Sequence, residues 1–267
     1  MHIIRIFAVS FIRFTKFSTS YPHFALFYPQ VYPRVFHIFS LQCPENVNSG
    51  VRFPESAQKN AFRLRQMSFI LTKAKGAQHM ERFDICNESG LPTGKTIDRE
   101  TAHREGILHR TAHVWIIRQN AGRWQVLLQK RSMNKDSFPG LYDTSSAGHI
   151  PAGDEPIDSA LRELEEELGI HAEPSDLTFA GTFRIQFEKT FHGRLFRDNE
   201  FATVYVCGLP VEAEQLALQE SEVSEVRWFD LETVMTEIQT DRSRFCVPAK
   251  GLQILADYLH AHPAQNA

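Results

Sequence analysis

The sequence predicts an α/β sandwich, in which helices cover both faces of a mixed β-sheet, preceded by an N-terminal extension. Strand-like runs occur both before and after one central amphipathic helix, and two further helical segments close the chain. Strands on both sides of a helix pack most simply as one sheet with helices on its faces. An apolar content of 42% is sufficient for such a core.

Residues 1–79 differ in character from the rest of the chain. They carry ten Lys/Arg and two Asp/Glu, a net charge of +8, whereas the other 188 residues carry 19 and 30, a net charge of -11. The segment is rich in Phe and Tyr but has no sustained period of 2 or 3.6. We expect no packed domain there, and interpret it as a disordered leader or as the product of an over-extended start site. An organelle transit peptide stays open, because the segment is basic and nearly free of acids. The domain itself is expected to span residues 80–267.

The composition also bears on partners and compartment. No run of about 18 apolar residues exists, so we expect no membrane segment, and nothing resembles a nucleic-acid recognition module. The four cysteines are scattered without a C-x-x-C pair. This spacing argues against a structural zinc site and favours a reducing, cytoplasmic location. The oligomeric state is not determined by these features.

The segments before the central helix read as strands. Residues 81–106 predict a short strand, a Ser-Gly turn and a return segment. HVWIIRQ at 113–119 and QVLLQKR at 125–131 are β-rich runs separated by the polar AGRW, which predicts a hairpin. A loop at 134–148 then leads into the helix.

The central helix is predicted for residues 155–168. Asp154 can cap its start, Pro156 suits its first turn, and Gly169 supplies a stop. Apolar residues at spacings of three and four form its buried stripe: Ile157, Ala160, Leu161, Leu164 and Leu168.

The segments after the helix read as strands and then helices. TFAGTFRIQFEKT at 178–190 and NEFATVYVCG at 199–208 predict longer strands, with FHGRLFRD between them. SEVRWFD at 224–230 predicts a further strand. LETVMTEIQ at 231–239 and KGLQILADYLHAH at 250–262 predict two helices.

Three acids on the central helix require an explanation. Glu163, Glu166 and Glu167 stand at i, i+3 and i+4, so they share one face and repel by about 0.2–0.5 kcal/mol per pair. They also lie in the last turns, where the helix dipole disfavours anions. A solvated Glu-rich face is the plain alternative. The neighbouring Arg162 and the flanking glycines favour a missing cation instead.

These residues carry a resemblance. The stretch resembles the Nudix box, G-x5-E-x7-R-E-U-x-E-E-x-G-U with U aliphatic, and eight of its nine positions match. The matching residues are Gly148, Arg162, Glu163, Leu164, Glu166, Glu167, Gly169 and Ile170. Asp154 stands where the pattern has Glu, which keeps the carboxylate but shortens its reach.

The resemblance implies a Nudix α/β/α sandwich and a metal-dependent site. The box carboxylates Glu163, Glu166 and Glu167 would hold Mg²⁺, with Mn²⁺ as a substitute, against a diphosphate. Magnesium prefers a few carboxylates together with phosphate oxygens. Glu166 or Glu167 would alternatively act as general base. Arg162 would contact substrate or orient the box glutamates.

A wider resemblance covers about residues 81–252 and points to the Nudix branch related to isopentenyl-diphosphate isomerases. Arg131 and Lys135 flank the segment that meets the diphosphate in those enzymes, so they and His149 are expected to bind substrate. Ala147 stands where the isomerases carry a catalytic Cys. Because alanine cannot move a proton on carbon, this favours hydrolysis.

The same resemblance leaves a second metal site open. His109, His149 and Glu200 align with metal ligands of the isomerases, Asp198 stands in place of a Glu, and His103 matches the remaining His only loosely. The alternative is that His109, His113 and His149 line a polar pocket. We keep both interpretations.

The sequence therefore predicts a Mg²⁺-dependent hydrolase of a small-molecule diphosphate linked to another group, X. Nucleotides, isoprenoid diphosphates and thiamine diphosphate are all compatible, because the box contacts only the diphosphate. Two alternatives remain: an isomerase-like enzyme, against which Ala147 argues, and a non-catalytic Nudix ligand-binding module, against which the intact box acids argue.

Overall fold

A computed structural model describes residues 81–263. The expectations for residues 1–79 and for the domain boundary at Met80 lie outside the described residues.

The described chain forms a two-stranded sheet, a seven-stranded sheet and four α-helices. The first part contains β1 (Arg82–Cys86), β2 (Pro92–Asp98), α4 (Arg99–Glu105), β3 (His109–Asn120), β4 (Arg123–Arg131), β5 (Tyr142–Asp143) and β6 (Ser146–His149). The second part contains α5 (Pro156–Leu168), η1 (Pro174–Asp176), β7 (Leu177–Phe191), β8 (Arg194–Cys207), η2 (Ala213–Gln215), β9 (Val223–Asp230), α6 (Leu231–Thr240) and α7 (Ala249–Ala261).

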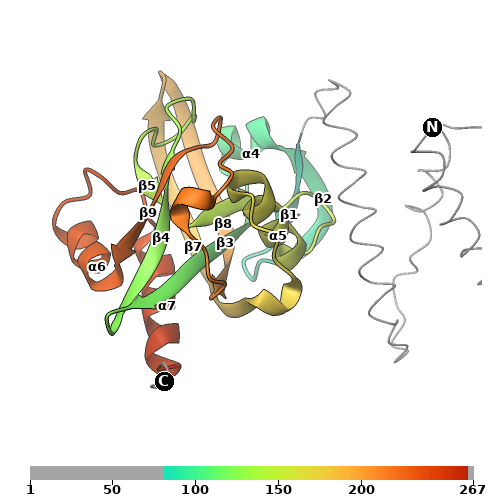
Figure 1. The fold of residues 1–267 in the computed structure, drawn as a ribbon. Coiled ribbons are helices and arrows are strands. Elements are labelled where there is room, and N and C mark those ends of the chain that lie inside the picture. The colour runs from blue at the N-terminus through green and yellow to red at the C-terminus, as the bar shows by residue number, and fades with distance from the viewer. Residues whose placement is uncertain (1–80, 264–267) are drawn as a thin grey trace, which may run out of the picture. The chain divides into compact units, whose positions relative to one another are not determined.

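The large sheet is mixed, as predicted. Its strand order is β5-β4-β3-β8-β7, with β6 paired to β3 and β9 paired to β4. The β3–β8 pairing is parallel and the other pairings are antiparallel. Strand β3 occupies the middle and connects both halves (Figure 1).

Side chains alternate along β3 and form two cores, one on each face of the sheet. Ala112, Val114 and Ile116 pack against α5. Trp115 and Ile117 belong to the other core, which α6 and α7 cover (Figure 1). The α/β/α sandwich is therefore confirmed.

Helix α5 begins one residue later than expected, and its cap differs. The N-cap is Glu155 in extended conformation, without a side-chain capping bond. The prediction that Asp154 caps the helix was wrong, because Pro156 occupies the first helical position and the residue directly before it becomes the cap. The C-terminal prediction is confirmed, since Gly169 adopts the left-handed conformation at φ 69°.

Three segments differ from the sequence interpretation. The loop predicted at 134–148 contains β5 and most of β6, which are too short for a period of two to show. The linker predicted at 191–198 is mostly strand, because β7 and β8 pair down to Phe191 and Arg194 with a turn at His192 and Gly193. Helix α4 was not predicted; Asp98 caps it by accepting a hydrogen bond from the Thr101 backbone N–H at 2.8 Å. Seven residues are too few for helical periodicity to show.

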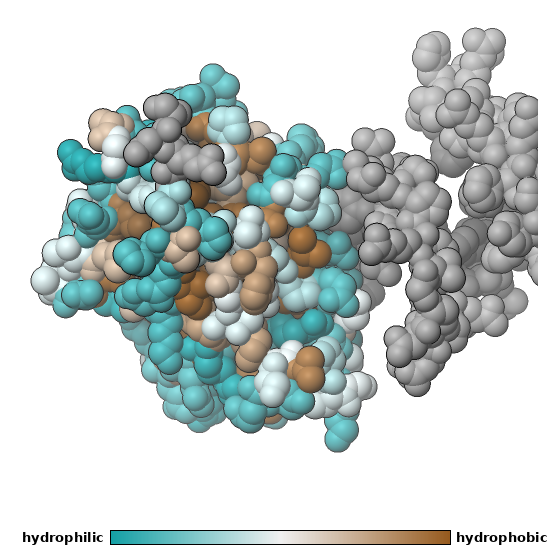
Figure 2. All heavy atoms as spheres, turned by 90° about the horizontal axis from the view of Figure 1, so that it is seen from below, coloured by the Kyte–Doolittle hydropathy of each residue, from teal (hydrophilic) through white to brown (hydrophobic). Residues whose placement is uncertain are grey.

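The surface in Figure 2 is largely hydrophilic, with hydrophobic residues toward the middle of the face in view. Within residues 81–263, four large hydrophobic side chains are clearly exposed: Leu91, Met133, Phe179 and Leu195. No helix in this part of the chain is long and apolar enough to cross a membrane.

Candidate active site

The box acids face the sheet where β6 pairs with β3. Gly148 lies opposite Ala112 and Ser146 lies opposite Val114, so both point to the face that α5 covers. A Cβ atom on Gly148 would stand 2.2 Å from the carboxyl carbon of Glu163. The glycine is therefore required by the close approach of this glutamate to the strand.

Glu167 is the most enclosed of the box acids, at 5% exposure. Its Oε2 accepts hydrogen bonds from Ser146 Oγ at 2.8 Å and from Gln129 Nε2 at 3.3 Å. Burial raises the pKa of Glu167 to about 8, and the charge of Glu163 adds to this shift. The Ser146 hydrogen bond and the positive charge of Lys135 act in the opposite direction.

Glu163 and Glu166 complete the acidic face. Burial raises the pKa of Glu163, the Arg162 guanidinium counteracts it, and the charge of Glu166 raises it further. Arg162 pairs with Glu163 at 2.9 Å and also donates to the His149 backbone carbonyl at 3.2 Å. Arg162 thus ties the box helix to β6 and holds one glutamate.

A divalent cation suits this group of residues. Carboxylates whose protons are retained by burial and mutual repulsion gain most from a bound cation. Oxygen is the ligand that magnesium prefers. The ion site at Glu163, Glu166 and Glu167 that the box pattern implies remains a prediction, because among residues 81–263 the group whose ligand atoms all lie within 4.8 Å of one another is a different one.

The expected phosphate-binding cations already have protein partners. Arg131 donates to the Ser137 backbone carbonyl at 2.9 Å and to Asp143 at 3.1 Å, so it supports the loop at 132–140. Lys135 forms an ion pair with Glu222. Substrate contact by either residue remains a prediction and requires these partners to be exchanged.

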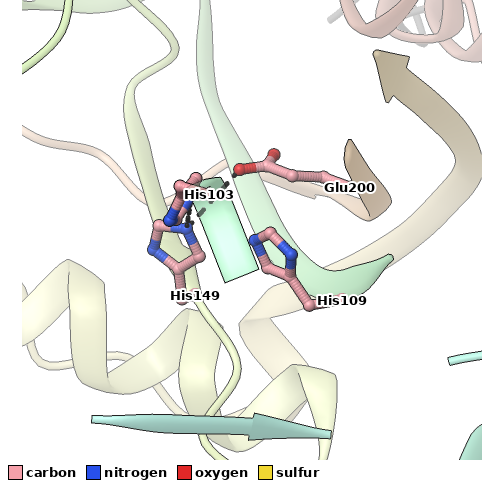
Figure 3. A group of neighbouring side chains, drawn as sticks. All are labelled: His103, His109, His149 and Glu200. Carbon is pink, nitrogen blue, oxygen red and sulfur yellow. Dashed lines mark hydrogen bonds and ion pairs between the residues drawn. The ribbon is translucent and has the colours of Figure 1, made fainter. Parts of the chain in front are cut away.

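A second cluster lies on the opposite face of the sheet. His103, His109, His149 and Glu200 come from α4, β3, β6 and β8, and their ligand atoms all lie within 4.8 Å of one another (Figure 3). Asp198 Oδ1 lies 3.8 Å from His103 Nε2. His103, which the sequence matched only loosely, is a full member of the cluster.

The hydrogen bonds of the histidines determine which nitrogens face the cluster. His103 Nδ1 lies 2.9 Å from the Arg99 carbonyl and His109 Nδ1 lies 2.8 Å from the Ile107 carbonyl, so both Nδ1 atoms donate. Both Nε2 atoms then keep a lone pair. His149 differs, because its Nδ1 lies 3.2 Å from an Arg99 guanidinium nitrogen and acts as acceptor.

Burial dominates the protonation of this cluster. It lowers the pKa of His103 and of His109 to about 4, and lowers that of His149 well below its usual value. It also raises the pKa of Asp198 to about 6 and that of Glu200 well above its usual range. Neutral imidazoles are the form that binds metals.

Comparison with known proteins identifies the family. A sequence model of the NUDIX domain matches residues 107–246, which is more than half of the chain. The chain belongs to the Nudix family.

Relatives of this Nudix protein come from plants and bacteria. It is 44% identical over 154 residues to Nudix hydrolase 3 of Arabidopsis thaliana, a match covering 57% of this chain and 19% of the plant protein. It is 36% identical over 143 residues to an uncharacterised Nudix hydrolase of Clostridium acetobutylicum, covering 54% and 66%. The chain thus spans less than two thirds of the length of these relatives. The crystal structure of DR0079 from Deinococcus radiodurans is 19% identical with a TM-score of 0.49, covering 66% of this chain and 98% of that one.

Sequence reasoning missed three residues beside the Nudix box. Gln129 and Ser146 contact Glu167 from β4 and β6. Glu222 is the third missed residue. Its turn is attached to the box helix, because the Gln219 backbone N–H donates to the Glu167 carbonyl at 3.0 Å. Periodicity reports only which face a residue occupies, and none of the three belongs to the box pattern.

Proposed function

We propose that this Nudix protein is a Mg²⁺-dependent hydrolase that cleaves a diphosphate linked to another group X, with Mn²⁺ as a substitute ion. The observation that carries the proposal is the partly buried acidic face of α5, where Gly148 leaves room for Glu163, and one hydroxyl and one amide donor orient the buried Glu167. Such a group has little structural purpose without a cation, because it destabilises the helix end that carries it.

The roles of the residues follow from charge. Glu163, Glu166 and Glu167 would hold magnesium, which would supply polarisation of phosphorus and a lowered pKa of the attacking water. Water attacks one phosphorus, the bridging P–O bond breaks, and the leaving phosphate takes the electron pair. Either Glu166 or Glu167 serves, instead of ligating the ion, as the general base that accepts the proton of that water. Arg162 holds Glu163 through their ion pair.

Binding of the diphosphate is assigned to Arg131, Lys135 and Arg162; the further assignment of His149 requires the substrate to reach the histidine cluster, where its side chain lies. The charge of Lys135 is felt by both Glu167 and His149, which supports its position at the site. If the Lys135 ammonium left Glu222 and paired with a phosphate oxygen, it would neutralise part of the charge of the substrate.

The test is a panel of diphosphate substrates with magnesium, with products identified by mass. Nucleoside, isoprenoid and thiamine diphosphates represent the three classes of X. Magnesium-dependent cleavage of one class, with a phosphorylated product, is expected. A panel in which no diphosphate is cleaved with Mg²⁺ or Mn²⁺ would contradict the proposal.

We further propose that the protein belongs to the branch resembling isopentenyl-diphosphate isomerases but lacks isomerase activity. The histidine–carboxylate cluster supports the resemblance, and His103, His109, His149 and Glu200 form a candidate second metal site. His109 Nε2 is buried without a hydrogen-bond partner among residues 81–263, as expected for a ligand atom. Ala147 lies beside this cluster, opposite His113, and offers no thiol.

A further inference from the structure

Gln129 is a buried amide with only one of its two ends satisfied. It lies on β4 at 3% exposure. Its Nε2 lies 3.3 Å from Glu167 Oε2, whereas no group within residues 81–263 donates a hydrogen bond to its Oε1. A buried amide oxygen without a donor lowers the stability of the fold.

Reversing the amide does not remove this cost. With a cation bound, Glu167 is an ionised acceptor, so a reversed amide would turn its oxygen toward another acceptor and lose the 3.3 Å bond from Nε2 to Oε2. The orientation with Nε2 toward Glu167 is therefore the favourable one. It leaves the amide oxygen beside the acidic face without a donor.

The bonds to Glu167 are also unevenly distributed. Ser146 and Gln129 both donate to Oε2, and Oε1 takes part in neither bond. Two donors from two different strands therefore fix the carboxylate plane while leaving one oxygen for another ligand.

We propose that Gln129 is a positioning residue of the magnesium site, which rests on the proposed function above. Its Nε2 fixes the Glu167 carboxylate, and its Oε1 accepts a hydrogen bond from a water molecule of the hydrated ion. Magnesium keeps several of its waters when bound to carboxylates, so such a donor is available. Partners of this kind commonly change metal affinity by about 10–100-fold.

The test is Gln129→Met in the full chain, which replaces the amide by an apolar side chain of similar length. In EDTA the variant should melt close to the wild-type temperature, because removal of the unsatisfied oxygen offsets the loss of the 3.3 Å hydrogen bond to Glu167. Electron paramagnetic resonance measures the bound Mn²⁺, and the part that excess Mg²⁺ displaces is assigned to the carboxylate site. The affinity of that site for Mn²⁺ should fall about 10–100-fold. Displacement by Mg²⁺ separates the carboxylate site from the histidine cluster.

Gln125→Met is the matched control. Gln125 lies four residues earlier on the same strand, and both ends of its amide are hydrogen-bonded. Its Oε1 accepts from Arg118 at 2.9 Å, and its Nε2 donates to Asp230 at 3.2 Å. This variant should lower the melting temperature and leave Mn²⁺ binding unchanged. A purely structural role for Gln129 would give the same pattern as Gln125.

Two results would overturn the inference: wild-type Mn²⁺ affinity in Gln129→Met, or a fall in its EDTA melting temperature like that of Gln125→Met. Gln129→Leu serves for the same measurements if the methionine variant does not fold. Glu163→Gln identifies the source of a failure. If Glu163→Gln loses Mn²⁺ binding and Gln129→Met keeps it, only the role of Gln129 is wrong; if both keep it, the magnesium site is wrong as well.

Discussion

Substitution of Gly148 by alanine should separate the function of the site from the stability of the fold. The new Cβ would lie 2.2 Å from the Glu163 carboxyl carbon and 2.3 Å from its Oε1. The carboxyl carbon must therefore move by about 1.2 Å to reach an ordinary contact distance of 3.4 Å. This movement also disturbs the 2.9 Å ion pair with Arg162.

The cost to stability should be small. The group that must move is the end of a flexible side chain, and an unfavourable rotamer of Glu163 costs about 0.5–1.5 kcal/mol. Replacing glycine by alanine within a strand returns about 0.5–1 kcal/mol. The free energy of unfolding should thus change by no more than about 1 kcal/mol.

The cost to activity should be large, because a misplacement of about 1 Å at a reacting centre reduces turnover about 100-fold. The assay is magnesium-dependent product release, measured with urea unfolding on the same preparations. Gly208→Ala is the control, since a Cβ at Gly208 meets nothing within 4 Å. Turnover of Gly148→Ala near that of the wild type would refute the assignment of Glu163 to the metal site.

Three further outcomes are expected. Glu166→Gln and Glu167→Gln should each fold normally and lose at least about 100-fold in turnover; wild-type rates in both at saturating magnesium would contradict the metal assignment. Burial lowers the pKa of His113 to about 4, so the folded protein keeps it neutral while the unfolded chain takes up a proton below about pH 6.5. The melting temperature in EDTA should consequently fall as the pH drops from about 6.5 to 4, and it should fall less steeply for His113→Leu than for the wild type. Equal slopes for the two proteins would refute this. Incubation with isopentenyl diphosphate in deuterated water should give no deuterated dimethylallyl product, and Ala147→Cys alone should not create efficient isomerisation; rapid deuterium incorporation by the wild type would overturn the hydrolase interpretation.

Local patterns in the sequence determined much of the architecture. The apolar stripe of α5, its proline start and its glycine stop are properties of neighbouring residues, so they were readable without the fold. The hairpin of β3 and β4 and the helices α6 and α7 were predicted for the same reason. Spacing of three and four residues also placed Glu163, Glu166 and Glu167 on one face.

The tertiary structure decided how these elements serve the site. Gln129 and Glu167 are 38 residues apart, and Thr111 and Glu200 are 89 apart, yet each pair is hydrogen-bonded. Strand pairing creates such contacts, and alternation along a strand indicates a face but no partner. Only the register of β6 against β3 therefore assigned Gly148 to the side of the box acids and Ala147 to the side of the histidines. Burial likewise depends on the complete fold, which is why the raised pKa of Glu167 and the exact partners of its carboxylate were beyond reach of the sequence.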